Sequence, residues 1–339
     1  MEPVLTIAVP TFNMESCLAK NLATYCDQRL ESRLEVICLN NASEDGSKEI
    51  ILRYVKQQPE IFRLYDRDTR GYGSSINAAI KGARGRYFRI VDADDWVDTE
   101  ELVQLVERLG ACNADVVLTD YQIVDMGSGR MTSVRAGEKD VCYGVVYHDF
   151  TLPIKTLPSI HGTTYRTGLL RECGFYMQDN MFFVDEEYVV LPYLAAKSVE
   201  YFPFDVYRYQ VANPQQSTSP KNRAKFREHR EKILRRLIGV YIGAERSGES
   251  RQALPYCFER IRNGVGDHFT TLYMYMENRA QGRKEAAAWS ELLRSLDDPR
   301  FYRQTACKAR ILCCLNRLHI GLQQYEFLKQ IFKRKERNA

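Results

Sequence analysis

Four short apolar runs, each followed by a polar loop and then by a helical pattern, are the feature of this sequence that most restricts its fold. The runs cover residues 4–9, 34–39, 61–65 and 87–91, and the first is apolar on both of its alternating faces. Such runs are typical of strands inside a parallel sheet, where helices cover both sides. The repetition of strand, loop and helix therefore predicts an α/β fold with an open parallel sheet and right-handed crossovers.

The second half of the sequence departs from this repetition. A further strand is expected at residues 114–119, and aromatic, strand-like residues return at 201–209. The polar, proline-containing stretch 213–220 is a break in composition, and beyond it the pattern is helical with no strand of note. We therefore expect an α/β domain over residues 1–220 and a helical C-terminal region over residues 221–339.

Composition and charge exclude several classes of protein. Hydrophobic residues make up 45% of the 339-residue chain and charged residues 27%, as in ordinary globular proteins, and a net charge of +4 is too small for a nucleic-acid-binding protein. The ten cysteines include no Cys-x-x-Cys pair, which argues against a zinc site and fits reduced thiols in a cytoplasmic protein. Because the first apolar run begins at residue 4 and no run approaches the ~20 residues of a spanning helix, we expect neither a signal peptide nor such a helix.

An acidic cluster, Asp92-Ala93-Asp94-Asp95, directly follows the fourth apolar run. Carboxylates this close repel one another unless a cation binds among them or nearby donors disperse the charge. Two interpretations are open at this point. The cluster is a Mg²⁺ or Mn²⁺ site that leaves room for phosphate, or it is the acidic start of the helix that follows, which the helix dipole favours.

Two more polar loops follow the first two apolar runs, at residues 10–13 and 40–47. In an open parallel sheet the carboxyl ends of the strands meet at one edge, and ligands bind there. These two loops and residues 92–95 are therefore expected at the same edge. Gly71-Tyr72-Gly73 lacks the third glycine of a dinucleotide fingerprint, so we do not expect that kind of site.

Four motifs, in order and spacing, give the chain a resemblance to the family 2 glycosyltransferases of GT-A fold over residues 1–220. They are Val9-Pro10-Thr11-Phe12-Asn13, the loop from Asn40 to Ser47, Asn77 ahead of Gly85-Arg86-Tyr87-Phe88, and Asp92-Ala93-Asp94-Asp95. The stretch 71–77, taken with residues 92–98, is similar to a bacterial subgroup associated with cell-surface polysaccharides. The resemblance implies a Rossmann-like, mainly parallel sheet with helices on both faces, and it makes residues 1–220 the catalytic domain.

This resemblance implies a metal-dependent, inverting glycosyltransferase of the hexosyltransferase type, with Mg²⁺ or Mn²⁺ as cofactor. The donor would be a nucleotide sugar, with UDP the usual nucleotide of the family, and the acceptor a hydroxyl of a glycan or of a lipid-linked sugar. Two other functions stay open: a sugar nucleotidyltransferase, and a non-catalytic protein that binds nucleotide sugars or glycans. A nucleotidyltransferase typically carries a Gly-rich, basic loop after its first strand, and Pro10-Thr11-Phe12-Asn13 is not one.

By the resemblance, residues from all four motifs hold the donor. Thr11 and the pair Asn40-Asn41 match nucleotide-contacting positions, although many family members have Asp at one of the two Asn positions; a turn with a helix cap is the alternative for that loop. Ile76 stands where many members have Arg, so we expect Arg70 or Arg84 to supply positive charge. The expected donor-binding residues are Pro10, Thr11, Asn13, Asn40, Asn41, Asn77, Asp92, Asp94 and Arg208.

The acidic cluster and one later carboxylate would carry the chemistry. By the resemblance, Asp92 and Asp94 are candidates for contacts with the ribose and the metal, and Asp94 and Asp95 are the expected metal ligands. Asp185 is the expected general base, which takes the proton of the acceptor hydroxyl, and the two glutamates that follow it are substitutes. The alternative for Asp185 is a helix cap.

Further side chains are candidates for binding the acceptor and the diphosphate. His161 and Tyr165 are candidates for the acceptor side, although a lone His is more often structural. Arg208 is a candidate for pairing with the diphosphate. Tyr207-Arg208-Tyr209, followed by Gln215, Gln216 and Ser217, resembles the segment that closes over the donor diphosphate. An ordinary arginine at a strand edge, followed by a linker, is the alternative.

Basic residues crowd the start of the C-terminal region, at 221–236, and an apolar stripe lies near its end, at Tyr325, Leu328, Ile331 and Phe332. A solvated helical face, or a stripe packed against the main domain, is one interpretation. The other is a peripheral contact with the inner face of the cell membrane, which would suit a lipid-linked acceptor.

Overall fold

The computed structural model describes residues 2–138, 141–148, 152, 154–211, 219–248, 253–321, 323–325 and 327. It divides into two compact units, one formed by Met1–Asn213 with Gly248–Leu254 and the other by Pro214–Ser247 with Pro255–Ala339. The segment expected to close over the donor, with Gln215, Gln216 and Ser217, lies outside the described residues. So do Leu328, Ile331 and Phe332 of the apolar stripe.

The first unit is built on one sheet that, in the described residues, has ten strands. Its main order is β3-β2-β1-β4-β9-β6-β10-β5, with β7 beside β6 and β8 beside β10. The strands are β1 (Leu5–Thr11), β2 (Leu34–Asn41), β3 (Phe62–Arg67), β4 (Tyr87–Ile90), β5 (Trp96–Val97), β6 (Val116–Asp125), β7 (Met131–Val134), β8 (Val146–His148), β9 (Thr163–Arg166) and β10 (Ser198–Val211).

Strands β1 to β4 pair in parallel, as the repeated strand–loop–helix pattern predicts. Strand β9 lies antiparallel between β4 and β6, and β10 then runs parallel to β6. Because β9 is only four residues long and directly precedes a helix, the sequence pattern did not identify it as a strand. The predicted, mainly parallel α/β sheet is therefore confirmed, with β9 reversed at its centre and the short strands β5, β7 and β8 also paired antiparallel.

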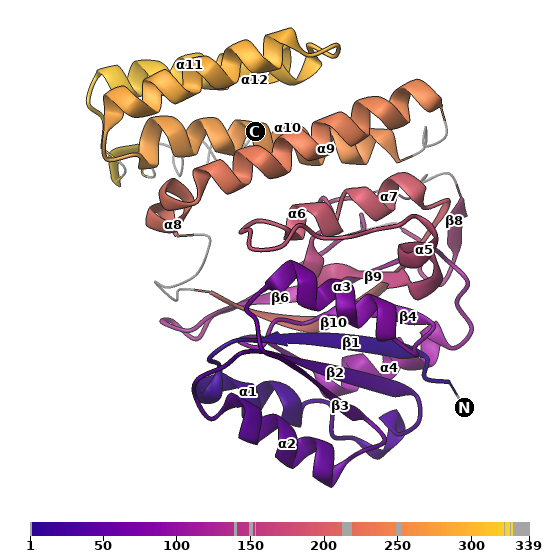
Figure 1. Cartoon of the computed structure of the whole chain (residues 1–339). Helices are drawn as coiled ribbons and strands as arrows, with labels where there is room; N and C mark the ends of the chain where they lie inside the picture. Colours follow the sequence, from indigo (N-terminus) through magenta and orange to yellow (C-terminus); the bar gives the residue numbers. More distant parts are fainter. Residues whose placement is uncertain are drawn as a thin grey trace. The chain divides into compact units, whose positions relative to one another are not determined.

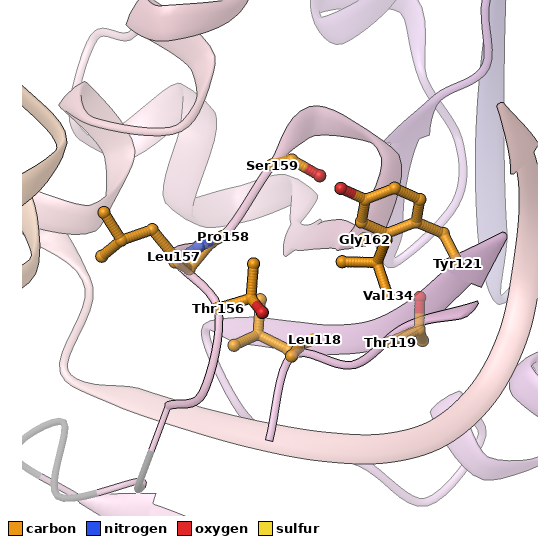
Figure 2. Close-up of a pocket in the computed structure, with 10 residues that line it drawn as sticks. Leu118, Thr119, Tyr121, Val134, Thr156, Leu157, Pro158, Ser159 and Gly162 are labelled. Atoms are coloured by element: carbon orange, nitrogen blue, oxygen red, sulfur yellow. The ribbon is translucent and has the colours of Figure 1, made fainter. Parts of the chain in front are cut away.

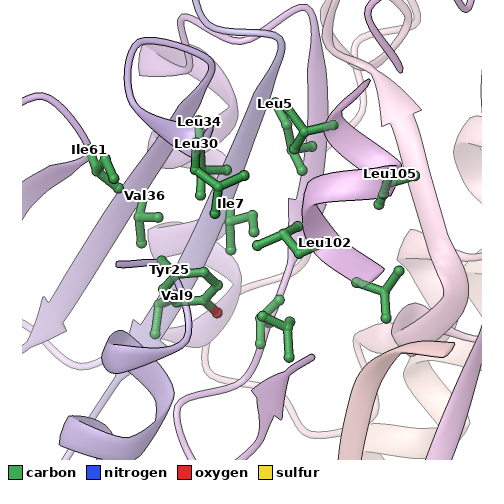
Figure 3. Close-up of a cluster of buried hydrophobic side chains, with 14 of the residues drawn as sticks. Leu5, Ile7, Val9, Tyr25, Leu30, Leu34, Val36, Ile61, Leu102 and Leu105 are labelled. Carbon is green, nitrogen blue, oxygen red and sulfur yellow. The ribbon is translucent and has the colours of Figure 1, made fainter. Parts of the chain in front are cut away.

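Helices cover both faces of this sheet (Figure 1). One buried core joins α1 (Glu15–Ala23), α2 (Ser47–Gln57) and α4 (Thr99–Leu109) to alternate residues of β1 such as Leu5 and Ile7, and Figure 3 shows part of it. Helix α3 contacts β1 and β2 outside that core, and it also contacts α5. Helix α7 contacts α5 and α6 of the same unit. Their bounds are α3 (Tyr72–Gly82), α5 (Thr167–Glu172), α6 (Asp185–Tyr188) and α7 (Leu191–Ala195), and two 3₁₀ turns occupy Gln28–Leu30 and Ile160–Gly162.

The register of the sheet brings the polar loops together. Thr11, at the end of β1, lies opposite Asn40, near the end of β2. Ala8 of β1 pairs with Ile90 of β4, so the acidic cluster continues from β4 beside the end of β1. The three loops therefore share the carboxyl edge of the sheet, where ligands of open α/β sheets bind.

The second unit is helical throughout its described residues. It contains α8 (Pro220–Lys225), α9 (Arg227–Ser247), α10 (Leu254–Thr270), a π-helical turn (Thr271–Tyr275), α11 (Arg279–Ser295) and α12 (Arg300–Arg317). Asn316 of α12 is buried and donates to the carbonyl of Tyr273, while its own oxygen accepts from Arg283 at 2.6 Å. No helix in the described part of the chain is long and apolar enough to cross a membrane.

His268 of α10 is a buried titratable group in the core of this unit. Its ring packs edge-on against Trp289, with the ring centroids 5.2 Å apart. Burial, and then the positive charges of Arg230, Arg227 and Arg235, lower its pKa to about 3. The folded unit therefore holds this imidazole neutral at a pH where an exposed histidine is protonated.

This difference predicts that acid destabilises the second unit. In the unfolded chain His268 binds a proton below about pH 6.5, so the stability is complete above that pH and is lost as the pH falls towards 3, at up to ~1.4 kcal/mol per pH unit. Urea unfolding followed by Trp289 fluorescence in a Trp96→Phe background measures the slope. His268→Gln should reduce it, whereas His319→Asn, at an exposed position, should not. Equal slopes in all three proteins would contradict the prediction.

Candidate active site

The acidic cluster at residues 92–95 is held in place by a side chain from α1. Asn21 is fully buried, and its amide nitrogen donates to the backbone carbonyls of Asp92 and Asp95, at 3.1 and 2.9 Å. Asn21 thus holds the main chain of the loop between β4 and β5 through two backbone carbonyls. Both of these bonds are to main-chain oxygen, which leaves the three carboxylates of the loop available to other partners.

Asp95 is tied to β10. The hydroxyl of Tyr207 donates to one carboxylate oxygen of Asp95 at 2.6 Å and accepts from the backbone N–H of Asp92 at 3.2 Å. The backbone N–H of Gln210 donates to the other oxygen of Asp95 at 2.7 Å. Burial, followed by the charges of Asp94 and Asp92, raises the pKa of Asp95 well above its usual value. Because both of its oxygens already accept from β10, its role as a metal ligand stays a prediction.

Asp92 and Asp94 face a more open environment. The hydroxyl of Tyr72, from α3, donates to Asp92 at 2.9 Å. Burial, and then the charge of Asp94, raise the pKa of Asp92 to about 7, and the charge of Asp185 acts in the same direction. Burial also raises the pKa of Asp94, which is half-buried; among the described residues, no other residue donates a hydrogen bond to its carboxylate. Asp94 is therefore the carboxylate of the cluster with the most capacity left for a ligand.

Asp185 is the first residue of α6, near this cluster. Its negative charge contributes to raising the pKa of both Asp92 and Tyr72. Phe183, two residues before it, has a φ of 69°, a left-handed conformation that non-glycine residues seldom adopt. Such strain clusters at functional sites. The structure thus brings the residue expected as the base towards the residues expected to bind the donor.

The loops after β1 and β2 are joined through Asn13. Its amide oxygen accepts from the backbone N–H of Glu44 at 2.8 Å, and its own N–H donates to Ser43 at 3.2 Å. Asn13 has a φ of 53°, and its side chain is exposed. Pro10 and Thr11 are the last two residues of β1, and both are buried. These residues shape the rim of the loop pair.

The two asparagines at the end of β2 differ in the hydrogen-bonding groups that remain available to a ligand. Asn40 donates to Asp66 at 2.7 Å and accepts from the N–H of Ser43 at 3.3 Å, so both ends of its amide are used. Asn41 is 4% exposed and donates to Ser75 at 3.4 Å, while its buried oxygen has no hydrogen-bond partner among the described residues. Asn41 therefore keeps an acceptor for an N–H group of a ligand.

Asn77 and Arg208 are both engaged within the protein. Asn77, on α3, uses its amide oxygen and nitrogen on the backbone of Met177, at 2.9 Å each. Arg208 is 9% exposed, pairs with Asp98 at 2.9 Å and also donates to the carbonyl of Asp205. Both residues stay predictions as donor ligands, and in this structure they brace neighbouring segments.

Only one of the two alternative cations lies beside the nucleotide loops. Arg70 stacks over the ring of Phe12 at 4.3 Å and pairs with Glu44 at 2.6 Å. Arg84 instead pairs at 2.6 Å with buried Glu35, near the start of β2. Because the start of a strand is at the opposite edge of the sheet from its carboxyl end, Arg84 is too far from the acidic cluster to serve it.

His161 belongs to an aromatic group next to the cluster, whereas Tyr165 does not. The His161 ring stacks on Tyr209 with centroids 4.1 Å apart and lies 4.8 Å from the ring of Tyr207. Tyr165 is fully buried and donates to the carbonyl of Tyr188 at 2.7 Å, so it does not line a surface. A mostly apolar pocket lies beside Tyr121 (Figure 2), and its lining includes Leu118, Thr119, Tyr121, Val134, Ala136, Thr156, Leu157, Pro158, Ser159 and Gly162.

Sequence reasoning gave no role to Tyr72 or Arg89, and it did not predict that the Tyr207 hydroxyl contacts the acidic cluster. Arg89 of β4 is fully buried, donates to Thr119 and Thr164 and to the carbonyl of His161, and has its pKa lowered by burial to about 10. The one available signal was an arginine inside an apolar run. Tyr72 gave none, because tyrosines in helices are usually core residues.

The carboxylates fit a metal held largely by its substrate. No group of three or more His, Cys, Asp or Glu in the described residues is arranged to hold an ion. Mg²⁺ is commonly bound through one or two carboxylates together with substrate phosphates and water, which needs no such group. Asp94, with its carboxylate free of other donors in the described part of the chain, suits that kind of binding.

Comparison with known proteins gives the following matches. Residues 6–174 match the model of the family described as "Glycosyl transferase family 2". The glycosyltransferase EpsJ of Bacillus subtilis is 33% identical over 117 residues, 34% of this chain and 33% of that protein. The poly(ribitol-phosphate) beta-glucosyltransferase of Bacillus spizizenii is 29% identical over 116 residues, 34% of this chain and 18% of that protein. The matched region is thus a third or less of the length of these two relatives.

The fold has close counterparts among solved structures. The S. aureus TarS 1–349 structure in complex with UDP-GlcNAc superposes with a TM-score of 0.60 at 19% identity, over 93% of this chain and 92% of that one. The same protein in complex with UDP gives a TM-score of 0.65 at 17% identity, over 93% and 91% of the two chains. At these identities the likeness shows the fold, and it confirms the predicted GT-A architecture with a helical C-terminal region.

The Tyr207 hydroxyl should stabilise the acidic loop. Tyr207→Phe leaves Asp95 and the N–H of Asp92 without this partner, so we expect a loss of ~1–3 kcal/mol in the free energy of unfolding of the first unit. Tyr143→Phe is the control, because Tyr143 of the same unit is 65% exposed. Urea unfolding curves measure both variants. Equal losses would contradict this role of Tyr207.

Proposed function

Because residues 6–174 of this chain belong to glycosyl transferase family 2, we propose that the protein transfers a sugar from a nucleoside-diphosphate donor to an acceptor hydroxyl. One observation supports this proposal: the register of the sheet brings the loops after β1 and β2 and the acidic loop after β4 to its carboxyl edge. The loops proposed to bind the donor therefore lie next to one another. Residues 1–220 are the proposed catalytic domain, and residues 221–339 the accompanying helical region.

UDP is the proposed nucleotide of the donor. The TarS structures of the same fold contain UDP-GlcNAc and UDP. In this chain, the buried oxygen of Asn41 offers an acceptor at the end of β2. Uracil presents an N–H that such an amide oxygen accepts. The loop pair joined by Asn13 would hold the nucleotide beside Thr11 and Asn41.

Asp94, with Asp92, is the proposed holder of Mg²⁺ or Mn²⁺ together with the donor diphosphate. When bound, such an ion stabilises the negative charge that grows on the departing nucleoside diphosphate. Tyr72 and Tyr207 donate or accept hydrogen bonds at this loop and keep its carboxylates and main chain in place. Arg70, which contacts Phe12 and Glu44, is the proposed cation beside the loops after β1 and β2.

Asp185 is the proposed general base. It would accept the proton of the acceptor hydroxyl while that oxygen attacks the anomeric carbon from the side opposite the diphosphate, so the product has inverted configuration. One relative, the poly(ribitol-phosphate) beta-glucosyltransferase of Bacillus spizizenii, supports a proposed glycan or lipid-linked acceptor. A non-catalytic sugar-nucleotide-binding protein is the alternative that the test below separates.

Substitution of Asp185 and of Asp94 should each reduce sugar transfer, but for different reasons. Asp185→Asn should lower kcat by about a hundredfold or more, because general-base catalysis contributes 10²–10⁴, and leave UDP affinity unchanged. Asp94→Asn should weaken the metal-dependent binding of UDP as well. UDP release from a panel of UDP-sugars, and the anomeric configuration of the product by NMR, are the measurements.

The matched control is Glu60→Gln, an exposed carboxylate before β3, at the opposite edge of the sheet. It should behave as the unchanged protein. If the unchanged protein binds UDP-sugars but releases no UDP with any donor and acceptor, the binding-protein alternative replaces this proposal. A product with retained configuration would remove the single-displacement step.

We also propose a peripheral contact of the helical region with an anionic membrane surface. The sequence of α12 has no Asp or Glu, and it places Arg303, Arg310 and Arg317 seven residues apart on its exposed side. Two exposed apolar side chains, Ile311 and Leu318, directly follow Arg310 and Arg317 and are 56% and 71% exposed. Two copies of this face would repel each other, because both carry positive charge. Helices that bind at membrane surfaces combine basic and apolar residues in this way.

Charge reversal tests this contact. The triple variant Arg303→Glu/Arg310→Glu/Arg317→Glu should lose at least tenfold in affinity for vesicles containing phosphatidylglycerol, because each basic residue near such a surface contributes ~1 kcal/mol. The matched control is Arg53→Glu/Lys56→Glu/Arg108→Glu, with the same charge change at exposed positions of α2 and α4. Vesicle co-sedimentation in low and high salt is the measurement. Equal binding of both triple variants would refute the contact through α12.

A further inference from the structure

The segment at residues 177–179 is clasped against the first turns of α3. Asn77 accepts from the backbone N–H of Met177 and donates to the backbone carbonyl of the same residue, both at 2.9 Å. This two-point pairing is the kind that one strand makes with another, here supplied by a single side chain. It uses both the oxygen and the nitrogen of the amide.

The two residues after Met177 extend the same contact. At Gly73 a Cβ atom would overlap the carbonyl oxygen of Gln178, so the close approach depends on the absence of a side chain. The carboxylate of Asp179 accepts from the backbone N–H of Ser74 at 3.1 Å, near the start of α3. Because Gly71 and Gly73 have no side chains, residues 177–179 can pack closely against the start of α3.

A buried carboxylate connects this segment to α6. Glu187 is fully buried, and its two oxygens accept from the backbone N–H and from the side-chain amide of Gln178, at 2.8 Å each. Glu187 lies two residues after Asp185 on the same short helix. The position of Asp185 is therefore linked through Glu187 and Gln178 to α3.

The chain between these two anchor points is conformationally strained. Asn180 and Phe183 have φ values of 54° and 69°. Left-handed conformations of non-glycine residues persist only where the surrounding contacts enforce them. The anchors on either side of residues 180–183 supply those contacts, directly before the helix that carries Asp185.

We propose that Asn77, Gly73 and Glu187 are positioning residues, which hold Asp185 opposite the acidic cluster. This inference rests on the proposed function, in which Asp185 is the base. It gives Asn77 a different role from the donor-binding one that the sequence resemblance implies. A positioning role predicts that substitution lowers kcat and leaves the affinity for the donor unchanged.

The expected size follows from how sharply catalysis depends on geometry. A displacement of about 1 Å of a reacting group costs on the order of a hundredfold in rate. Asn77→Ala removes both bonds to Met177, and Gly73→Ala forces the carbonyl of Gln178 away. Each should lower kcat for sugar transfer by tenfold to a hundredfold, with the donor KM and the Kd for UDP within about twofold of the unchanged protein.

Three further variants sharpen the experiment. Glu187→Gln, which replaces one acceptor with a donor facing Gln178, should show the same pattern of low kcat and unchanged UDP affinity. The double variant Asn77→Ala/Gly73→Ala should fall short of the product of the single effects, because both act on one clasp. Gly239→Ala is the matched control, since a Cβ there meets nothing within 4 Å.

Hydrogen exchange of the amides at residues 177–188 gives a readout without turnover. It should speed up in Asn77→Ala and in Glu187→Gln but not in Gly239→Ala. A rise of tenfold in the UDP Kd of Asn77→Ala would overturn the inference and restore a donor-binding role. Unchanged kcat in an active enzyme with faster exchange would overturn it too. An unchanged protein without transferase activity would instead refute the proposed function.

Discussion

Three carboxylates within four residues can stay at the end of a buried strand only if the protein, or a bound cation, compensates their repulsion. Here the compensation comes from the hydroxyl groups of Tyr72 and Tyr207, from a β10 amide, and from Asn21 beneath the loop. These donors belong to α3, β10 and α1, which are far apart in the sequence. The elements of the first unit are thus arranged around one electrostatic problem, and Asp94 is the side chain that they leave open.

The sequence predicted the architecture well because hydrophobic periodicity and loop chemistry are local. The strands at residues 34–39 and 87–91 and the polar loops after them emerge where expected, and the register of β1 and β2 places Thr11 beside Asn40. The shared position of these loops follows from parallel pairing alone. Strand β9 was missed because four residues ahead of a helix carry too little pattern.

The site was harder to predict, because the role of a polar residue depends on which distant residue it meets. Nothing in the local sequence tells that Asn40 meets Asp66, or that Arg208 meets Asp98. Arg84 matched the needed charge, yet the crossover topology puts it at the wrong edge of the sheet. The resemblance placed Tyr207 in a segment over the diphosphate, and only the structure shows that its hydroxyl joins β10 to the acidic loop.

The anchored loop at residues 180–183 has a consequence for how this protein can diversify. Its two ends are fixed by Gln178 and Glu187, while Phe182 within it is 38% exposed. These anchors would keep Asp185 in place while mutations at Phe182 change the surface beside it. With Asp185 as the proposed base, such mutations would alter which acceptors fit while leaving the proposed chemistry in place.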